Sequence, residues 1–109
     1  MIKFRSRVTG DVIMLQATGQ QILKILGKND ADSQNKGIVL PVDMPAAISA
    51  LQAAVAAEEA LRKQLIDEAR ANGEPAPRFE GVSLRQRTTP LIDMFRRCQA
   101  ADKEVVWGV

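Results

Sequence analysis

Residues 43 to 72 read DMPAAISALQAAVAAEEALRKQLIDEARAN, and this stretch decides the fold because it predicts one long helix. Asp43 can cap the first free N–H groups, and Pro45 falls in the first turn, where no N–H donor is required. After Pro45 the stretch contains neither glycine nor proline and is rich in alanine, the strongest helix former. The Asn72-Gly73 pair supplies a left-handed stop, so we expect a helix over residues 44 to 71.

The predicted helix is long for its chain. At the rise of an α-helix, residues 44 to 71 span about 42 Å. A compact chain of 109 residues has a radius of gyration of about 13 Å, which corresponds to a diameter of roughly 34 Å. The helix is therefore expected to be as long as its own domain or longer.

The two halves of this helix differ in their apolar face. The first half carries a regular stripe formed by Met44, Ile48, Leu51 and Val55. In the second half the stripe continues but contains charged residues. Either it simply reaches solvent there, or it packs on a second copy of the protein through a tentative interface of Glu58, Leu61, Arg62, Leu65 and Ile66. On the opposite side a smooth face, suited to close helix packing, is formed by Ala46, Ala53, Ala57 and Ala60.

Composition indicates an ordinary soluble protein. The chain has 109 residues, of which 46% are hydrophobic and 26% charged, and we expect a single domain over residues 1–109. The opening MIKFRSRV lacks the apolar segment of a signal peptide, and the longest uncharged run is too short to cross a bilayer. With Cys98 as the only cysteine, no intrachain disulfide can form, so a cytoplasmic location without membrane association is expected.

Several chemistries are excluded by the residues that are missing. The chain has no histidine, which removes histidine acid/base catalysis and every histidine-containing zinc site. It has no tyrosine, and its other aromatic residues are scattered, so no platform for stacking bases is expected. The pair Asp30 and Asp32 lacks the glycine and glutamate of a calcium loop. We therefore predict no catalytic residue, no cofactor and no metal.

The segment before the long helix predicts two strands, a short helix and an edge strand. Residues 2 to 8 alternate apolar and polar side chains, and after a turn at residues 9 to 11 the run VIML returns as a strand that is apolar on both faces. Thr18 is the expected cap of a short helix that ends at Gly27. Residues 28 to 37 form a polar, mobile loop, and residues 38 to 41 form a short extended segment suited to a sheet edge.

The segment after the long helix predicts a connector, a last helix and a last strand. Residues 73 to 81 are a connector between the two helices. Ser83 and Gln86 form a capping box for the last helix, whose expected buried face is Leu84, Thr88, Leu91, Ile92 and Phe95. Pro90 leaves two alternatives: a helix that continues, with a kink, through it, which the apolar spacing favours, or an extended segment followed by a helix that begins at Thr89-Pro90.

Residues 104 to 109 predict the last strand, with Val105, Trp107 and Val109 facing the core. The order of elements predicts an α+β fold in which a small antiparallel sheet, made of the N-terminal hairpin and the C-terminal strand, is packed by one long and one or two shorter helices.

Charge is distributed unevenly along the chain. Residues 1 to 28 carry five basic and one acidic side chain and residues 78 to 98 carry five and two, whereas residues 29 to 77 carry four and eight. One interpretation is self-complementarity, within the fold or between two copies. The other is an anion patch for nucleic acid or a phosphorylated ligand, formed by Lys3, Arg5, Arg7, Arg85 and Arg87.

Five segments of the chain resemble a known family. They are FRS with GDVIML, MPAAI with its alanine- and glutamate-rich continuation, VSLRQR, PLI and the C-terminal VVWGV. Over essentially the whole chain the sequence is similar to small bacterial proteins known as domain of unknown function number eighteen-forty. The resemblance implies a bacterial cytoplasmic origin and brings no activity, ligand or catalytic residue.

Three functional hypotheses follow. The first is a non-enzymatic interaction or accessory module that forms a homodimer and is compatible with a further protein partner. The second is an anion- or nucleic-acid-binding regulator that uses the basic strand face. The third is an enzyme of unrecognised type.

Overall fold

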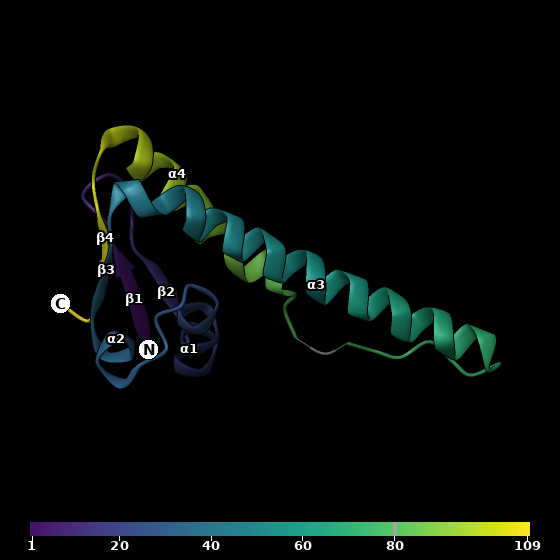
Figure 1. Ribbon diagram of the computed structural model, residues 1–109. Coiled ribbons are helices and arrows are strands. Elements are labelled where there is room, and N and C mark those ends of the chain that lie inside the picture. Colours follow the sequence, from purple (N-terminus) through teal and green to yellow (C-terminus); the bar gives the residue numbers. More distant parts are fainter. Residues whose placement is uncertain (80) are drawn as a thin grey trace.

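The computed structural model describes residues 1–79 and 81–109 and shows an α+β fold, as predicted (Figure 1). Its strands are β1 (Ile2–Arg5), β2 (Val12–Met14), β3 (Gly37–Val39) and β4 (Val105–Trp107). Its helices are α1 (Gln16–Ile25), α2 (Ala31–Asn35), α3 (Met44–Ala71) and α4 (Leu84–Ala101), and a 3-10 turn, Pro41–Asp43, precedes α3.

The four strands form one antiparallel sheet in the order β2-β1-β4-β3. The last strand of the chain therefore lies between the first hairpin and β3, which occupies an edge as expected for a segment that is followed by proline. Side chains alternate across the sheet, so one face carries the buried residues and packs against the helices. The buried face consists of Ile2, Phe4, Met14, Val39, Val105 and Trp107.

The hairpin is shorter than the sequence predicts. Strand β1 ends at Arg5 because the Ser6 hydroxyl accepts hydrogen bonds from the backbone N–H groups of Val8 and Thr9, at 3.0 and 3.1 Å, and so starts the turn early. The expectation that the returning strand, apolar on both faces, is the more buried of the two is also wrong. Ile13 is 56% exposed, because in the described structure the helices lie on the other face of the sheet (Figure 1).

Two predictions for the next segment are corrected. Helix α1 begins at Gln16, two residues before the predicted cap Thr18, with a backbone hydrogen bond of 2.9 Å from Gly19 N–H to Leu15 C=O. The predicted polar loop contains the short helix α2, whose cap is Asp30: its carboxylate accepts from Ser33 N–H at 3.1 Å. The side chain of Ser33, together with this backbone hydrogen bond, lowers the pKa of Asp30 because both stabilise the charged form of the carboxylate.

Trp107 joins the sheet to α2. Its indole packs against Phe4, with ring centroids 5.7 Å apart, and covers the Cα of Gly37, its partner on β3. The indole Nε1–H donates to Ser33 C=O at 2.6 Å, which satisfies its one polar group inside the core. Strand β4 ends there, because Gly108 takes a φ of 74°; Val109, predicted to face the core, is 69% exposed.

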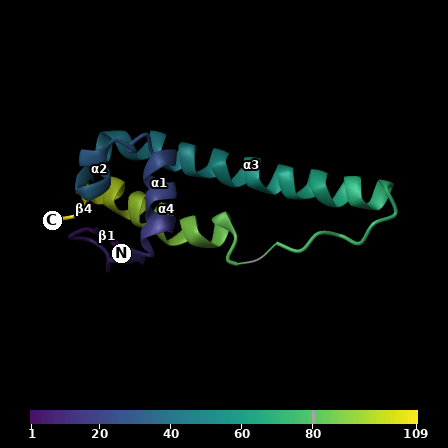
Figure 2. The same cartoon turned by 90° about the horizontal axis from the view of Figure 1, so that it is seen from below.

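Helix α3 has the predicted bounds and extends beyond the sheet and the other helices (Figure 1). Its first half is buried along the predicted stripe, whereas its second half extends away from the sheet (Figures 1 and 2). The principal dimensions are 52 × 27 × 23 Å, and the radius of gyration of 16.0 Å exceeds the roughly 13 Å of a compact chain of this length. Asp43 makes no cap hydrogen bond, because its backbone already belongs to the preceding 3-10 turn rather than being extended.

The chain returns along α3 through residues 73–81, of which residue 80 lies outside the described part, and enters α4 (Figure 2). The Ser83–Gln86 capping box is present, and α4 runs without interruption through Pro90, which confirms the continuous alternative. Because Pro90 has no N–H, the C=O of Gln86, four residues earlier, has no helical donor. Pro90 and Gln86 are both exposed, so water can reach this carbonyl. The predicted face is buried except for the half-buried Ile92, and Met94 and Cys98 add to it.

The contact between Gly37 and Trp107 leads to a first prediction. A Cβ added at Gly37 would overlap the indole of Trp107, so Gly37→Ala is expected to reduce the free energy of unfolding by about 1–3 kcal/mol in urea denaturation. Gly10→Ala is the control, because nothing lies within 4 Å of its Cβ position. Equal midpoints for both variants would contradict the packing at Trp107.

Candidate functional site

The second half of α3, residues 58 to 71, projects from the molecule and is called the arm (Figure 1). It contains the whole interface predicted from the sequence. Leu61 and Leu65 are 56% and 40% exposed, respectively. Glu58, Arg62 and Ile66 are only partly exposed. The predicted residues therefore separate into an outward pair of leucines and an inward group.

The inward group explains why charged residues interrupt the apolar stripe of α3. The Glu58 carboxylate accepts from Leu84 N–H at 3.1 Å, so it caps the first turn of α4 from a neighbouring helix. The same oxygen lies 3.1 Å from Nη2 of Arg62. The Arg62 guanidinium in turn lies over the ring of Phe79, 4.8 Å from its centroid. These two charged residues therefore hold α4 and the returning chain against the arm.

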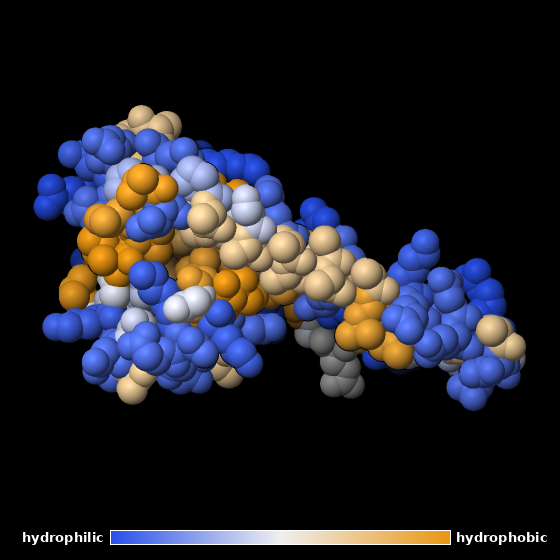
Figure 3. All heavy atoms as spheres, viewed as in Figure 1, coloured by the Kyte–Doolittle hydropathy of each residue, from blue (hydrophilic) through white to orange (hydrophobic). Residues whose placement is uncertain are grey.

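The outward side of α3 is covered by no other element of the described structure. Its four alanines, Ala46, Ala53, Ala57 and Ala60, are all exposed, and Leu61 and Leu65 lie at their edge. Together these six residues are called the alanine face. In Figure 3 the visible side of α3 is a band of weakly hydrophobic surface that leads to more hydrophobic atoms farther along the helix.

The predicted anion patch is divided between two parts of the molecule. Lys3 and Arg5 lie on the outer face of β1, opposite the helices, and Arg7 is exposed in the turn that follows. The Arg5 side chain donates to Val109 C=O at 3.3 Å and lies 3.9 Å from the Asp11 carboxylate. The strand face thus holds two of the five predicted cations and the turn after it holds a third, with Arg5 engaged by its own chain.

The other two predicted cations lie on α4 and make contacts within the protein. Arg85 forms a two-point contact with the Glu59 carboxylate, at 2.6 and 3.0 Å. These hydrogen bonds lower the pKa of Glu59 and raise that of Arg85, because each stabilises the charge of the other. Arg87 donates to Val82 C=O at 3.1 Å and to the Thr18 hydroxyl. The structure therefore does not bring the five residues together.

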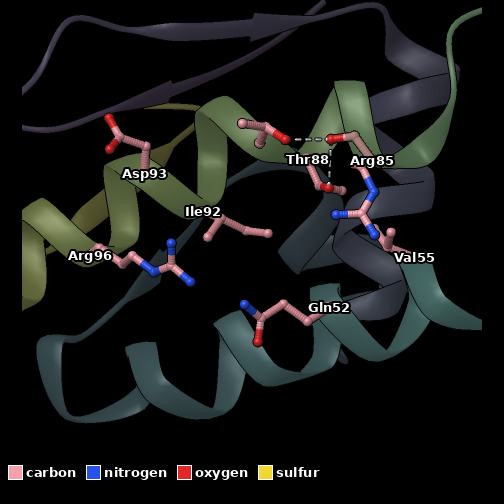
Figure 4. Close-up of a pocket in the computed structure, with 8 residues that line it drawn as sticks. Gln52, Val55, Arg85, Thr88, Ile92, Asp93 and Arg96 are labelled. Carbon is pink, nitrogen blue, oxygen red and sulfur yellow. Dashed lines mark hydrogen bonds between the residues drawn. The ribbon is translucent and has the colours of Figure 1, made fainter.

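A cleft that the sequence analysis missed lies between α3 and α4 (Figure 4). Its volume is about 510 Å³, and it is lined by Gln52, Val55, Arg85, Thr88, Thr89, Ile92, Asp93 and Arg96. The residues from α4 recur every three or four positions, a spacing that places them on one helix face. That spacing was readable from the sequence, but the opposing Gln52 depends on how the two helices pair.

Neither a metal-binding cluster nor a membrane-spanning helix is found among the residues that the structure describes. Among residues 1–79 and 81–109, no three side chains of the histidine, cysteine, aspartate or glutamate type gather closely enough to hold a metal ion. Within the same ranges, no helix combines the length and the apolar character needed to cross a membrane.

The fold and its surfaces define a small α+β protein with a projecting helical arm. The sequence model of the family described as domain of unknown function (DUF1840) matches residues 1–107, so the chain belongs to this family. Neither the search of curated proteins nor that of solved structures found a match.

The contact of Glu58 with α4 leads to a second prediction. Glu58→Gln removes the negative charge at the start of α4 and beside Arg62, and it is expected to reduce the free energy of unfolding by about 1–2 kcal/mol. Glu68→Gln is the control on the same helix, because Glu68 is exposed and its carboxylate accepts from the Gln64 amide one turn before it, on the same helix; its effect should stay within about 0.5 kcal/mol. Thermal unfolding of both variants measures the difference, and an unchanged Glu58→Gln protein would show that the cap contributes nothing.

Proposed function

We propose that this protein is a cytoplasmic, non-enzymatic interaction module that forms a homodimer through the alanine face. The observation that carries the proposal is the outward side of α3, which exposes Leu61 and Leu65 on the half of the helix that extends away from the sheet (Figure 1). An apolar side chain gains about 25 cal/mol for each Å² removed from water, so covering these leucines favours association.

Most charges beside this face are already engaged within one copy. At 100° per residue, positions 59, 62 and 63 point away from Leu61, whereas Glu58 lies beside Leu65 and Glu68 lies between the alanines and the leucines. Glu58 is used by Leu84 N–H and Arg62, and Glu59 is used by Arg85. Two copies can therefore meet through their leucines with Glu58 already neutralised, and their orientation has to keep the two Glu68 carboxylates apart.

Small side chains also favour a symmetric helix pair. Where alanine replaces larger residues at a helix contact, the two backbones approach more closely, at the short end of the usual 8–10 Å separation of helix axes. A two-fold axis across the alanine face lets each copy present the same surface to the other. Such an assembly also covers the arm, which is exposed on its outward side in one copy.

The non-enzymatic part of the proposal is supported by the side chains available for chemistry. The chain has no histidine, and its only thiol, Cys98, is completely buried in the core. A thiol in such an environment has no access to a substrate.

Light scattering coupled to size-exclusion chromatography tests the oligomeric state. The expected mass is twice the 11.9 kDa of one chain. A mass equal to one chain at high protein concentration would overturn the homodimer.

A pair of variants tests the surface. Leu61→Glu places a charge on the alanine face and is expected to shift the protein to a monomer, because two carboxylates would be buried in the dimer. Lys63→Glu is the matched control: it introduces the same residue two positions away, on another side of α3, with a larger change of charge, and the dimer should persist. A dimer in both variants would place the interface elsewhere, and a monomer in both would show that net charge, rather than this face, controls association.

A further inference from the structure

The cleft between α3 and α4 contains one positive charge that no described acidic side chain neutralises. Arg85 is paired with Glu59, and Asp93 is paired with Arg97 at 3.0 Å. Among residues 1–79 and 81–109, no ion pair engages Arg96. The cleft therefore presents one free guanidinium group, whose five N–H donors suit a carboxylate.

A second donor faces Arg96 from the opposite helix. In Figure 4 the side chains of Arg96 on α4 and Gln52 on α3 extend toward each other across the cleft. The two threonine hydroxyls of the lining are already used, because Thr88 donates to Leu84 C=O at 2.9 Å and Thr89 donates to Arg85 C=O at 2.6 Å. Arg85 also lines the cleft, but its charge is already neutralised by Glu59, so Arg96, with Gln52 opposite, is the place in the described cleft where an anion meets an unpaired cation.

The lining of the cleft is mixed, and its apolar part consists of Val55 and Ile92. Val55 is buried and Ile92 is half-buried, and in Figure 4 Ile92 lies between the two helices near Arg96 and Gln52. The volume of about 510 Å³ lies in the range of sites for small organic ligands. A small inorganic ion at Arg96 would leave Ile92 without a contact.

We propose that the cleft binds an organic monoanion that consists of a carboxylate and a short apolar body. The carboxylate lies against the Arg96 guanidinium in a two-point contact and accepts a further hydrogen bond from the Gln52 amide. The apolar body covers Ile92 and Val55. A single unpaired cation matches a single negative charge, and the nearby Asp93 disfavours a ligand with two.

A carboxylate with a short apolar body can come from two sources: a free small carboxylic acid, or the C-terminus of a peptide with an apolar last residue. Both present the same groups to Arg96 and to the apolar part of the lining. The site is separate from the alanine face, which lies on another side of α3, so it does not depend on the dimer.

Titration of the ¹⁵N-labelled full chain, followed by NMR, tests the proposal with four probes. Hexanoate and N-acetyl-leucine represent the two sources, and hexanamide and N-acetyl-leucinamide are their uncharged equivalents. The expected result is that at least one carboxylate shifts the side-chain amide signals of Gln52 and the Nε–H signal of Arg96, whereas both amides leave them unchanged. The tighter of the two carboxylates identifies the source. Equal shifts from acids and amides, or no shift at these side chains, would overturn the proposal.

Variants on and just after α4 provide the matched comparison. Arg96→Ala is expected to weaken binding of the tighter carboxylate at least about tenfold, and Arg96→Lys is expected to weaken it less, because an ammonium group keeps the charge without the two-point contact. Lys103→Ala is the control, since it removes an exposed positive charge just after α4 that does not line the cleft. Equal losses for Arg96→Ala and Lys103→Ala would indicate general charge attraction and overturn the site, as would inorganic phosphate bound as tightly as the carboxylates.

Discussion

The position of Trp107 is the constraint on which the rest of the structure depends. Its strand lies between β1 and β3, so the sheet is complete only when the end of the chain has joined its beginning. The indole contacts Phe4 on one neighbouring strand, covers Gly37 on the other and donates to α2 through Ser33 C=O. One side chain thus ties together segments that are up to about a hundred residues apart, and the absence of a side chain at Gly37 is what makes room for it.

The two long helices depend on a second, polar interaction. Glu58 lies within the apolar sector of α3, where a charged residue is normally unfavourable, but its carboxylate caps the start of α4 and pairs with Arg62. The capping box of Ser83 and Gln86 supplies two further hydrogen bonds at this end, to the N–H groups of Ser83 and Gln86. The register between α3 and α4 is therefore set by charge at one end and by the buried apolar side chains of both helices along the rest of the contact.

This arrangement divides the surface of α3 into sides with different properties. One side is buried in the core and by α4. The outward side carries the alanine face, for which we propose a second copy of the chain, and a further side forms the cleft with α4, for which we propose an organic monoanion. The basic residues of β1 remain on the outer face of the sheet, away from both surfaces.

The sequence by itself determined the bounds of α3, the capping box of α4, the continuity of α4 through Pro90 and the burial of Trp107, because each depends on local propensity or on the periodicity of apolar residues. Predictions from the sequence were wrong where a side chain made another contact. Ser6 accepts hydrogen bonds in the turn and ends β1 early, and Thr18 is a partner of Arg87 instead of a helix cap. The strand order, the separation of Arg85 and Arg87 from Lys3 and Arg5, and the position of Gln52 opposite Arg96 across a cleft (Figure 4) came only from the tertiary structure. These features depend on contacts between residues far apart in the sequence, and the periodicity of one element carries no information about which face of another element it meets.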